Sequence, residues 1–91
     1  MYNTLTLSNI LEILKKRLLY RASYRGTKEM DILLSSFVNK YIHLLDRSNL
    51  EELEKFLNFD DETILNFYNY NLIAKKIDEN KISKLFKSHK I

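Results

Sequence analysis

Residues 24–33 read YRGTKEMDIL and contain Gly26, the only glycine of a chain that has no proline. Glycine adopts a positive φ without steric cost and therefore often follows the end of a helix. Thr27 is a good N-cap residue. Glu29 and Asp31 lie in the first turn of the helix that it would open, where the helix dipole favours negative charge. This stretch therefore predicts a corner that joins two helices.

Apolar residues recur along the chain at spacings of three and four, and strict alternation is nowhere sustained. This periodicity is typical of short amphipathic helices, so we expect an all-α fold, a compact bundle of five short helices in one domain over residues 1–91. The first helix is expected over about residues 8–23 with Ser8 as its N-cap, and the second from near Thr27. The residues expected in the core are Ile10, Leu11, Leu14 and Leu18 in the first helix, and Met30, Leu33, Leu34, Phe37, Tyr41 and Leu44 in the second.

A capping box, SNLE from Ser48 to Glu51, predicts the start of the third helix, because the two side chains can satisfy backbone N–H groups reciprocally. The sequence DDET predicts the start of the fourth helix, with Asp60 or Asp61 as its cap. The fifth helix is expected near residues 76–88. The core residues expected in these helices are Leu50, Leu53 and Leu57, then Ile64, Leu65, Phe67 and Tyr68, and finally Ile77, Ile82, Leu85 and Phe86.

The composition excludes several classes of protein. The chain has no cysteine, which rules out disulfide bridges, thiolate metal sites and a thiol nucleophile. No stretch approaches the roughly 20 apolar residues that span a bilayer, and no charged region followed by an apolar run marks a secretory signal. Because the chain starts at Met1 without a presequence, we expect a bacterial cytoplasmic location rather than a mitochondrial matrix.

Patterns for catalysis and metal binding are weak. Helix capping explains the acidic run at residues 60–62 better than a divalent cation does, since such a cation needs oxygen ligands from several directions. His43 and His89 are the only histidines, and no cysteine is present to complete a zinc site with them. A single glycine rules out a glycine-rich phosphate loop. An enzyme is therefore the least supported interpretation, and no metal is expected.

The formal net charge of +3 conceals a mosaic. Residues 1–45 carry seven basic and three acidic groups, residues 46–62 carry two and seven, and residues 75–91 carry six lysines and two acids. Such a mosaic favours a protein partner over generic nucleic-acid binding, which usually needs a broad face of one sign. The C-terminal lysines keep open an alternative, a small basic helical nucleic-acid-binding or antitoxin-like regulator.

The predicted corner admits two interpretations. In the first it is purely structural: Gly26 ends one helix, a threonine caps the next, and Arg25 pairs with Glu29. In the second it is a recognition surface, because Arg17 and Arg21 lie four residues apart and share a helix face that leads toward Arg25. Like charges gathered in this way cost stability and often serve binding. The residues alone leave both interpretations open.

RGTKEMDILL, residues 25–34, resembles the Arg-Gly-x-x-Glu motif, with the aspartate that follows it, of the SdhE or succinate dehydrogenase assembly factor 2 family. RLLYRA, residues 17–22, resembles the segment upstream of that motif. FDDETILNFY, residues 59–68, resembles the later Asp-Asp signature and its aromatic residue. In all, about residues 14–70 align without obvious gaps.

The resemblance implies a chaperone-like assembly factor of five helices. Members of this family promote covalent attachment of FAD to the flavoprotein subunit of succinate dehydrogenase and, in bacteria, of fumarate reductase. The flavoprotein itself forms the bond between its histidine and the 8α-methyl group of the flavin. The chain is therefore expected to be no enzyme, to carry no cofactor of its own, to bind no nucleic acid and to be a monomer.

The same resemblance implies the site residues. The sequence departs from the family pattern in two places. Tyr24 lies where bacterial members commonly have a second arginine, so the charged contact of that arginine is either lost or supplied by Arg21. The segment 69–75 lacks the glycine and proline that many members have there. The residues assigned to partner binding are Arg25, Gly26, Glu29, Asp31, Arg21 and Arg17, with Phe67 and Tyr24 in support.

Overall fold

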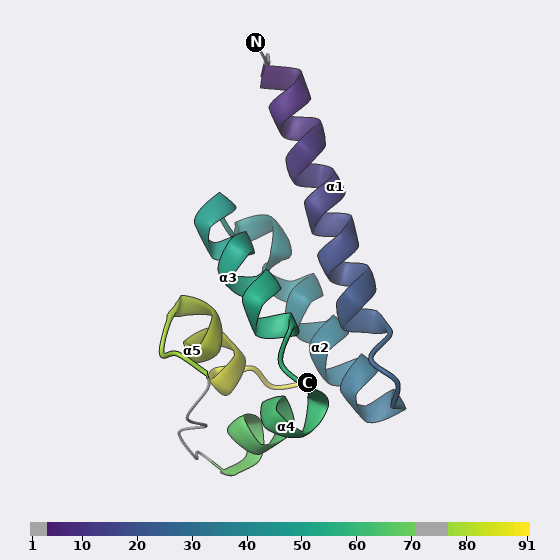
Figure 1. Cartoon of the computed structure of the whole chain (residues 1–91), viewed down its shortest axis with the longest axis vertical. Helices are drawn as coiled ribbons and strands as arrows, with labels where there is room; N and C mark the ends of the chain where they lie inside the picture. Colours follow the sequence, from purple (N-terminus) through teal and green to yellow (C-terminus); the bar gives the residue numbers. More distant parts are fainter. Residues whose placement is uncertain (1–3, 71–76) are drawn as a thin grey trace.

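A computed structural model of the chain describes residues 4–70 and 77–91, with the side chains of residues 9–70 and 77–91. These residues form five α-helices and one short 3₁₀ turn (Figure 1). The elements are α1 Thr4–Ser23, α2 Lys28–Tyr41, η1 Ile42–Leu44, α3 Arg47–Leu57, α4 Asp61–Tyr70 and α5 Lys81–Ser88. The predicted fold class, an all-α bundle of five helices, is confirmed.

One core of buried apolar side chains joins the helices. α1 packs against α2 and α3, and α5 packs against α3 and α4. Phe86 of α5 is fully buried, and its ring centroid lies 5.1 Å from that of Phe37 in α2 and 5.0 Å from that of Phe56 in α3. Aromatic pairs at such distances contribute ~0.5–1.5 kcal/mol each beyond the burial of their area. The short C-terminal helix is therefore tied to the two helices at the centre of the bundle.

Helix α1 starts one turn earlier than predicted, at Thr4, so the expected N-cap at Ser8 is wrong. Leu18 and Ala22 are fully buried, whereas Ile10 is 45% exposed and is not the core residue that we expected. Figure 1 shows the reason, because the N-terminal half of α1 extends beyond the other helices. A helical stripe is buried only where another element covers it.

Helix α2 starts as predicted, with the Thr27 hydroxyl accepting a hydrogen bond from the Met30 backbone N–H at 3.3 Å. Its expected core stripe is buried as far as Phe37, and Tyr41 is partly buried. Leu44, however, is 75% exposed, which contradicts the prediction. After Tyr41 the chain tightens into the 3₁₀ turn η1, which changes the phase of the side chains. Ile42 and Leu45 are buried instead.

Helix α3 is capped by Asp46, whose carboxylate accepts from the Asn49 backbone N–H at 2.8 Å. The predicted capping box of Ser48 with Glu51 is therefore wrong, because the helix starts before it, at Arg47. Its apolar stripe is nevertheless the predicted one. Leu50, Leu53 and Leu57 are buried, and Phe56 joins them.

Helix α4 is capped by the first of the two candidate aspartates. The Asp60 carboxylate accepts from the Thr63 backbone N–H at 2.8 Å, and the helix starts at Asp61. Ile64 is fully buried, and the other predicted core residues of α4 are partly buried against the core. The choice between two adjacent caps is thus settled by where the first helical turn lies.

Helix α5 starts at Lys81, five residues later than predicted, and it is preceded by a capping box that was not predicted. Asn80 accepts from the Ser83 backbone N–H at 3.0 Å, and its own N–H donates to the Ser83 hydroxyl at 2.9 Å. Ile77 is buried as expected, although it precedes the helix. The predicted start at residue 76 and most of the stretch 69–75 lie outside the described residues.

Candidate partner-binding site

The Gly26 corner, which we define as residues 24–29, links the end of α1 to the start of α2. Gly26 has a φ of +119°, in the region that favours glycine, so the predicted positive φ is confirmed. No atom outside its chain neighbours lies within 4 Å of the position that a Cβ would occupy. Residues 26–29 are all exposed. The backbone of the corner is thus open to contact from outside.

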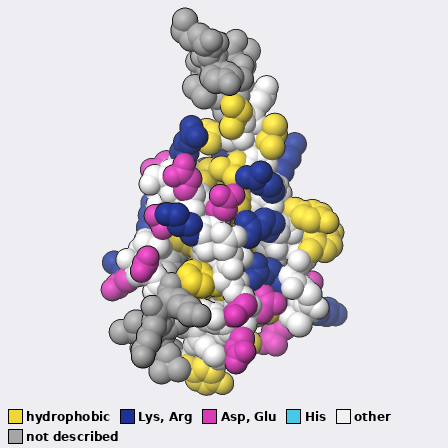
Figure 2. Space-filling model, viewed as in Figure 1, with side chains coloured by type: hydrophobic (Ala, Val, Ile, Leu, Met, Phe, Trp, Pro, Cys, Tyr) yellow, Lys and Arg dark blue, Asp and Glu magenta, His cyan; other side chains and the backbone are white. Residues whose placement is uncertain are grey.

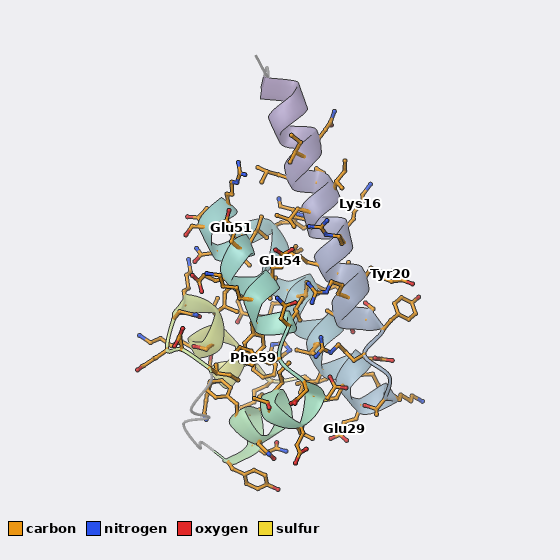
Figure 3. The ribbon with its side chains drawn as sticks, in the orientation of Figure 1. Lys16, Tyr20, Glu29, Glu51, Glu54 and Phe59 are labelled. Atoms are coloured by element: carbon orange, nitrogen blue, oxygen red, sulfur yellow. The ribbon has the colours of Figure 1, made fainter. Side chains whose placement is uncertain are left out.

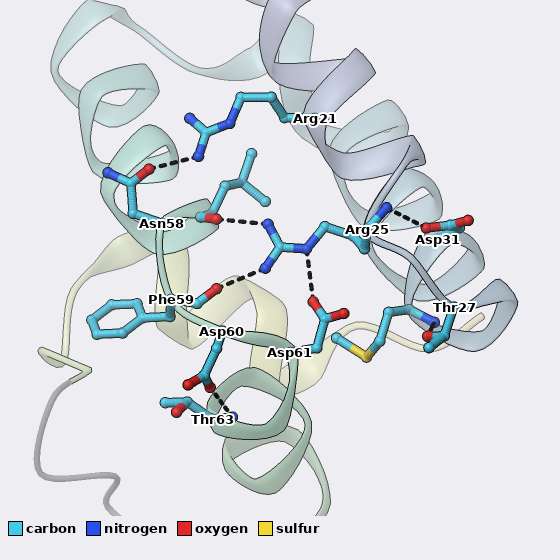
Figure 4. A network of polar contacts seen from close by, with 11 residues as sticks. Arg21, Arg25, Thr27, Asp31, Asn58, Phe59, Asp60, Asp61 and Thr63 are labelled. Atoms are coloured by element: carbon cyan, nitrogen blue, oxygen red, sulfur yellow. Dashed lines mark hydrogen bonds and ion pairs between the residues drawn. The ribbon is translucent and has the colours of Figure 1, made fainter.

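Arg25 holds this corner from the inside (Figure 4). Its Nε donates to the Asp61 carboxylate at 2.8 Å, while Nη1 and Nη2 donate to the carbonyl oxygens of Leu57 and Phe59 at 2.6 and 2.7 Å. The side chain is only 11% exposed. The guanidinium group therefore joins the corner to the end of α3 and to the start of α4, and its charge is compensated within the molecule.

Asp31 completes the attachment on the other side of the corner. Its carboxylate accepts a hydrogen bond from the Arg25 backbone N–H, so the carboxylate bonds to the corner's own backbone (Figure 4). The predicted pairing of Arg25 with Glu29 is wrong, since Asp61 is the acidic partner. Glu29 is exposed at the start of α2, where Figure 3 labels it on the lower right. Of the two acids that follow Gly26, only Glu29 is exposed.

Arg17 and Arg21 lie on the same side of α1 as predicted, but both turn toward α3. Arg17 pairs with Glu54 at 3.2 Å, and Arg21 donates to the Asn58 side-chain oxygen at 2.6 Å. With Arg25 they form a row of three arginines that bind successive positions of α3 and the chain that follows it. The three guanidinium groups are spread along α3 and the segment after it rather than gathered at the corner, and each binds an acceptor of this chain.

The two aromatic residues assigned a supporting role lie in different environments. Tyr24 is exposed, and its ring centroid lies 4.6 Å from that of Tyr20, one helical turn earlier. Phe67 is partly buried, 6.5 Å from the ring of Phe56, and the Lys87 ammonium lies 4.6 Å above its ring centroid. Phe67 therefore helps to hold α4 and α5 together, whereas Tyr24 lies at the surface.

A groove of about 450 Å³ lies beside the Gly26 corner. It brings together residues from the end of α1 and the start of α4, regions far apart in the sequence. From the sequence, Tyr20 was assigned no role and Asp61 only a capping role. The spacing of four between Tyr20 and Tyr24 was the signal that could have found the pair. The lining residues are Tyr20, Arg21, Tyr24, Arg25, Asp60 and Asp61.

The two histidines lie in different environments. His43 is exposed, whereas His89 is buried and contacts the Ser36 hydroxyl through Nε2 at 2.9 Å. Among the described residues no group of three or more His, Cys, Asp or Glu side chains is placed to hold a metal ion. In the same part of the chain, no helix combines the length and apolar character needed to cross a membrane.

The fold and the corner define a small helical protein that presents an internally braced loop. Among families of known proteins, the one described as "Flavinator of succinate dehydrogenase" matches residues 16–90. This chain belongs to that family. The predicted resemblance to succinate dehydrogenase assembly factor 2 is thereby confirmed, and the match extends beyond the motif into α5. No solved structure matches the chain significantly.

Three relatives named "Succinate dehydrogenase assembly factor 2, mitochondrial" illustrate the similarity. The Dictyostelium discoideum protein is 36% identical over 84 residues, which cover 87% of this chain and 56% of the relative. The Lodderomyces elongisporus protein is 33% identical, covering 82% and 48%, and that of Scheffersomyces stipitis is 32% identical, covering 89% and 51%. The chain spans about half the length of these relatives.

The names of these relatives correct one prediction. Each is named as a mitochondrial protein, so the predicted bacterial cytoplasmic location is wrong. The prediction relied on where the sequence begins. The chain matches only about half of each relative, and the start of such a match carries no information on targeting.

Proposed function

We propose that this chain is an assembly factor for succinate dehydrogenase that promotes covalent attachment of FAD to the flavoprotein subunit in the mitochondrial matrix. The match of the family model to residues 16–90 carries the proposal. The relatives are named as assembly factors and not as enzymes, which supports a non-catalytic role. None of these names favours the nucleic-acid-binding alternative. In this proposal the chain has no cofactor of its own and acts as a monomer, and a fumarate reductase flavoprotein is a second client.

The assembly factor acts by binding one conformer of its partner more tightly than the others. The flavoprotein supplies the reacting groups, and the chain stabilises the arrangement in which they meet. Shifting a population from 1:99 to 99:1 needs ~5.5 kcal/mol of differential affinity, which a few well-oriented contacts can supply. Contacts made by a preorganised surface cost less entropy on binding than contacts made by a loose loop.

In this proposal the residues of the corner have two different roles. Arg25 and Asp31 bond to the molecule itself and fix the shape of the loop. Gly26 and Glu29 lie on its exposed side and are the partner-facing groups in this proposal. Arg25 is then a positioning residue, and its replacement would change the loop as well as any contact.

Glu29→Ala tests the proposal without disturbing the internal contacts of the corner. The flavoprotein subunit is expressed in cells that lack an endogenous assembly factor, alone or with the chain, and covalent flavin is measured by in-gel fluorescence after denaturation. We expect the wild-type chain to raise the signal and Glu29→Ala to lose most of the gain, because the exposed carboxylate is a docking group.

Glu51→Ala is the matched control, since Glu51 is also an exposed helix glutamate and lies away from the corner (Figure 3). It should raise covalent flavin as the wild type does. Equal fluorescence with and without the wild-type chain would overturn the proposed function. Equal activity of wild type and Glu29→Ala would instead remove Glu29 from the docking surface.

A further inference from the structure

The α3–α4 junction, which we define as residues 57–61, lies behind the Gly26 corner and bonds to it through Arg25. The Arg25 guanidinium donates to two backbone carbonyl oxygens of the junction at 2.6 and 2.7 Å, and to the Asp61 carboxylate at 2.8 Å (Figure 4). Of these three acceptors, only the Asp61 carboxylate carries a negative charge. Asp61 is therefore the group that both orients the guanidinium and compensates its charge.

The two adjacent aspartates of the junction have different contacts. The Asp60 carboxylate accepts from the Thr63 backbone N–H at 2.8 Å and caps α4. The Asp61 carboxylate binds Arg25, 36 positions earlier in the chain. Glu62 also lies in the first turn of α4 and is exposed. Helix α4 thus keeps its cap and a first-turn acid when Asp61 is replaced, so a substitution of Asp61 should act on the corner.

The pair of Arg25 and Asp61 lies largely inside the molecule, with side chains that are 11% and 31% exposed. Figure 2 shows basic side chains along the middle of this face and acidic side chains below them, so opposite charges meet on this side of the molecule. Removing one partner of a largely buried ion pair is costly, because the other charge is then left uncompensated in a poorly solvated place. Without the carboxylate we expect the guanidinium to turn toward water, and the corner then loses its attachment to the junction.

We propose that Asp61 is a positioning residue for partner binding, which fixes the shape of the Gly26 corner through Arg25 without touching the partner itself. The inference rests on the proposed function. It separates the roles of the two neighbouring aspartates, because Asp60 starts α4 and Asp61 holds the docking corner. The exposed groups of the corner, Gly26 and Glu29, then depend on a carboxylate from a distant part of the chain.

Binding of the purified chain to the FAD-free flavoprotein subunit, measured by calorimetry, tests the proposal. Asp61→Asn removes the charge at nearly constant size and should weaken binding roughly tenfold, within the range of coupling inside one hydrogen-bond network. Asp61→Glu keeps the charge and should lose less affinity. Glu62→Gln removes the same charge from the same helical turn and should bind like the wild type. If Asp61 only filled space, asparagine would be the better substitute, and if it only served the helix dipole, Glu62→Gln would weaken binding equally.

The free protein offers a direct view of the corner, because Gly26 is the only glycine of the chain. Labelling with ¹⁵N-glycine gives a single backbone amide signal in an NMR spectrum, and that signal comes from the corner. Asp61→Asn should move this signal in the absence of any partner, whereas Glu62→Gln should leave it in place. A change in binding is thereby separated from a change in the shape of the corner.

A double-mutant cycle tests whether Asp61 acts through Arg25. In the Arg25→Gln background, Asp61→Asn should weaken binding no further, since the charge that it compensates is already gone. Additive losses would assign Asp61 a direct contact with the partner and overturn the inference. Wild-type affinity of Asp61→Asn, an unmoved Gly26 signal, or loss of its helical circular dichroism would also overturn it and leave the proposed function standing. A wild-type chain that neither binds the subunit nor raises its covalent flavin would overturn both.

Discussion

Arg25 was assigned to partner binding from the family resemblance, yet its side chain faces inward. Its three side-chain hydrogen bonds reach Leu57, Phe59 and Asp61, and its own N–H reaches Asp31. Charge-assisted hydrogen bonds are roughly twice as strong as neutral ones, so this set holds the loop firmly. The neighbouring Gly26 keeps the backbone in a conformation that other residues avoid. The exposed part of the corner therefore has a fixed shape before any partner arrives.

Substitutions of Gly26 should separate backbone strain from surface blocking. Because nothing lies within 4 Å of its missing Cβ, Gly26→Ala and Gly26→Arg meet no clash and carry only the strain of φ +119°. We expect both to lower the free energy of unfolding by about 1–3 kcal/mol, measured by urea denaturation. Gly26→Ala should still promote flavinylation, whereas Gly26→Arg should abolish it by covering the docking surface. Equal loss of activity in both variants would assign the defect to backbone conformation.

At the scale of elements, the start of each helix depends on which of several possible caps is used. Both Asp46 and Ser48 are good N-cap types, and Ser48 also has a glutamate at the right distance for a capping box. The chain uses Asp46, and Ser48 lies exposed inside the first turn of α3. Local chemistry thus offers both caps, and packing of the leucine stripe against the core selects one.

Alanine substitutions at these two positions distinguish the caps. Asp46→Ala should lower the free energy of unfolding by about 0.5–2 kcal/mol, because the Asn49 N–H loses its acceptor. Ser48→Ala should change it by less than about 0.5 kcal/mol, as surface substitutions usually do. Thermal or urea unfolding followed by circular dichroism measures both. A larger effect at Ser48 than at Asp46 would contradict the observed start of α3.

At the scale of the whole molecule, His89 links the segment after α5 to α2 and α4. The imidazole Nε2 contacts the Ser36 hydroxyl of α2 at 2.9 Å, and the Tyr68 hydroxyl of α4 donates a hydrogen bond to the His89 carbonyl oxygen at 2.6 Å. The ring also packs edge-on against Phe37. Its buried Nδ1 has no hydrogen-bond partner among the described residues. A neutral ring fits this position, and a charged one would not.

Stability should therefore fall in mild acid. Burial, and then the positive charge of Lys40, lower the pKa of His89 below its usual 6.5. Between the folded-state pKa and the unfolded-state pKa of 6.5, the unfolded chain binds a proton that the folded chain does not. The stability that the neutral His89 ring contributes is therefore complete above pH 6.5 and is lost as the pH falls toward the folded-state pKa. Urea unfolding at pH 7.5 and 5 should show this loss. His89→Gln should reduce the pH dependence, whereas His43→Gln, at an exposed position, should retain it.

The sequence by itself determined the helical class, the inward stripes of α2 and α3, the turn at Gly26 and the cap at Thr27. These features depend on residues within about four positions of one another, where periodicity and capping chemistry act directly. It also placed Arg25, Gly26 and Glu29 at one corner, because all three lie within three residues of the predicted turn at Gly26.

Only the tertiary structure decided where Arg25 points and what surrounds it. Its acidic partner is 36 residues away at Asp61, and no local rule relates two positions so far apart. Packing likewise decided that Leu44 is exposed, because η1 changes the helical phase without a glycine or proline to mark it. The groove beside Tyr24 exists for the same reason, since the packing of the helices brings the start of α4 beside the end of α1. Local patterns specify which groups a helix can offer, and packing specifies which of them meet.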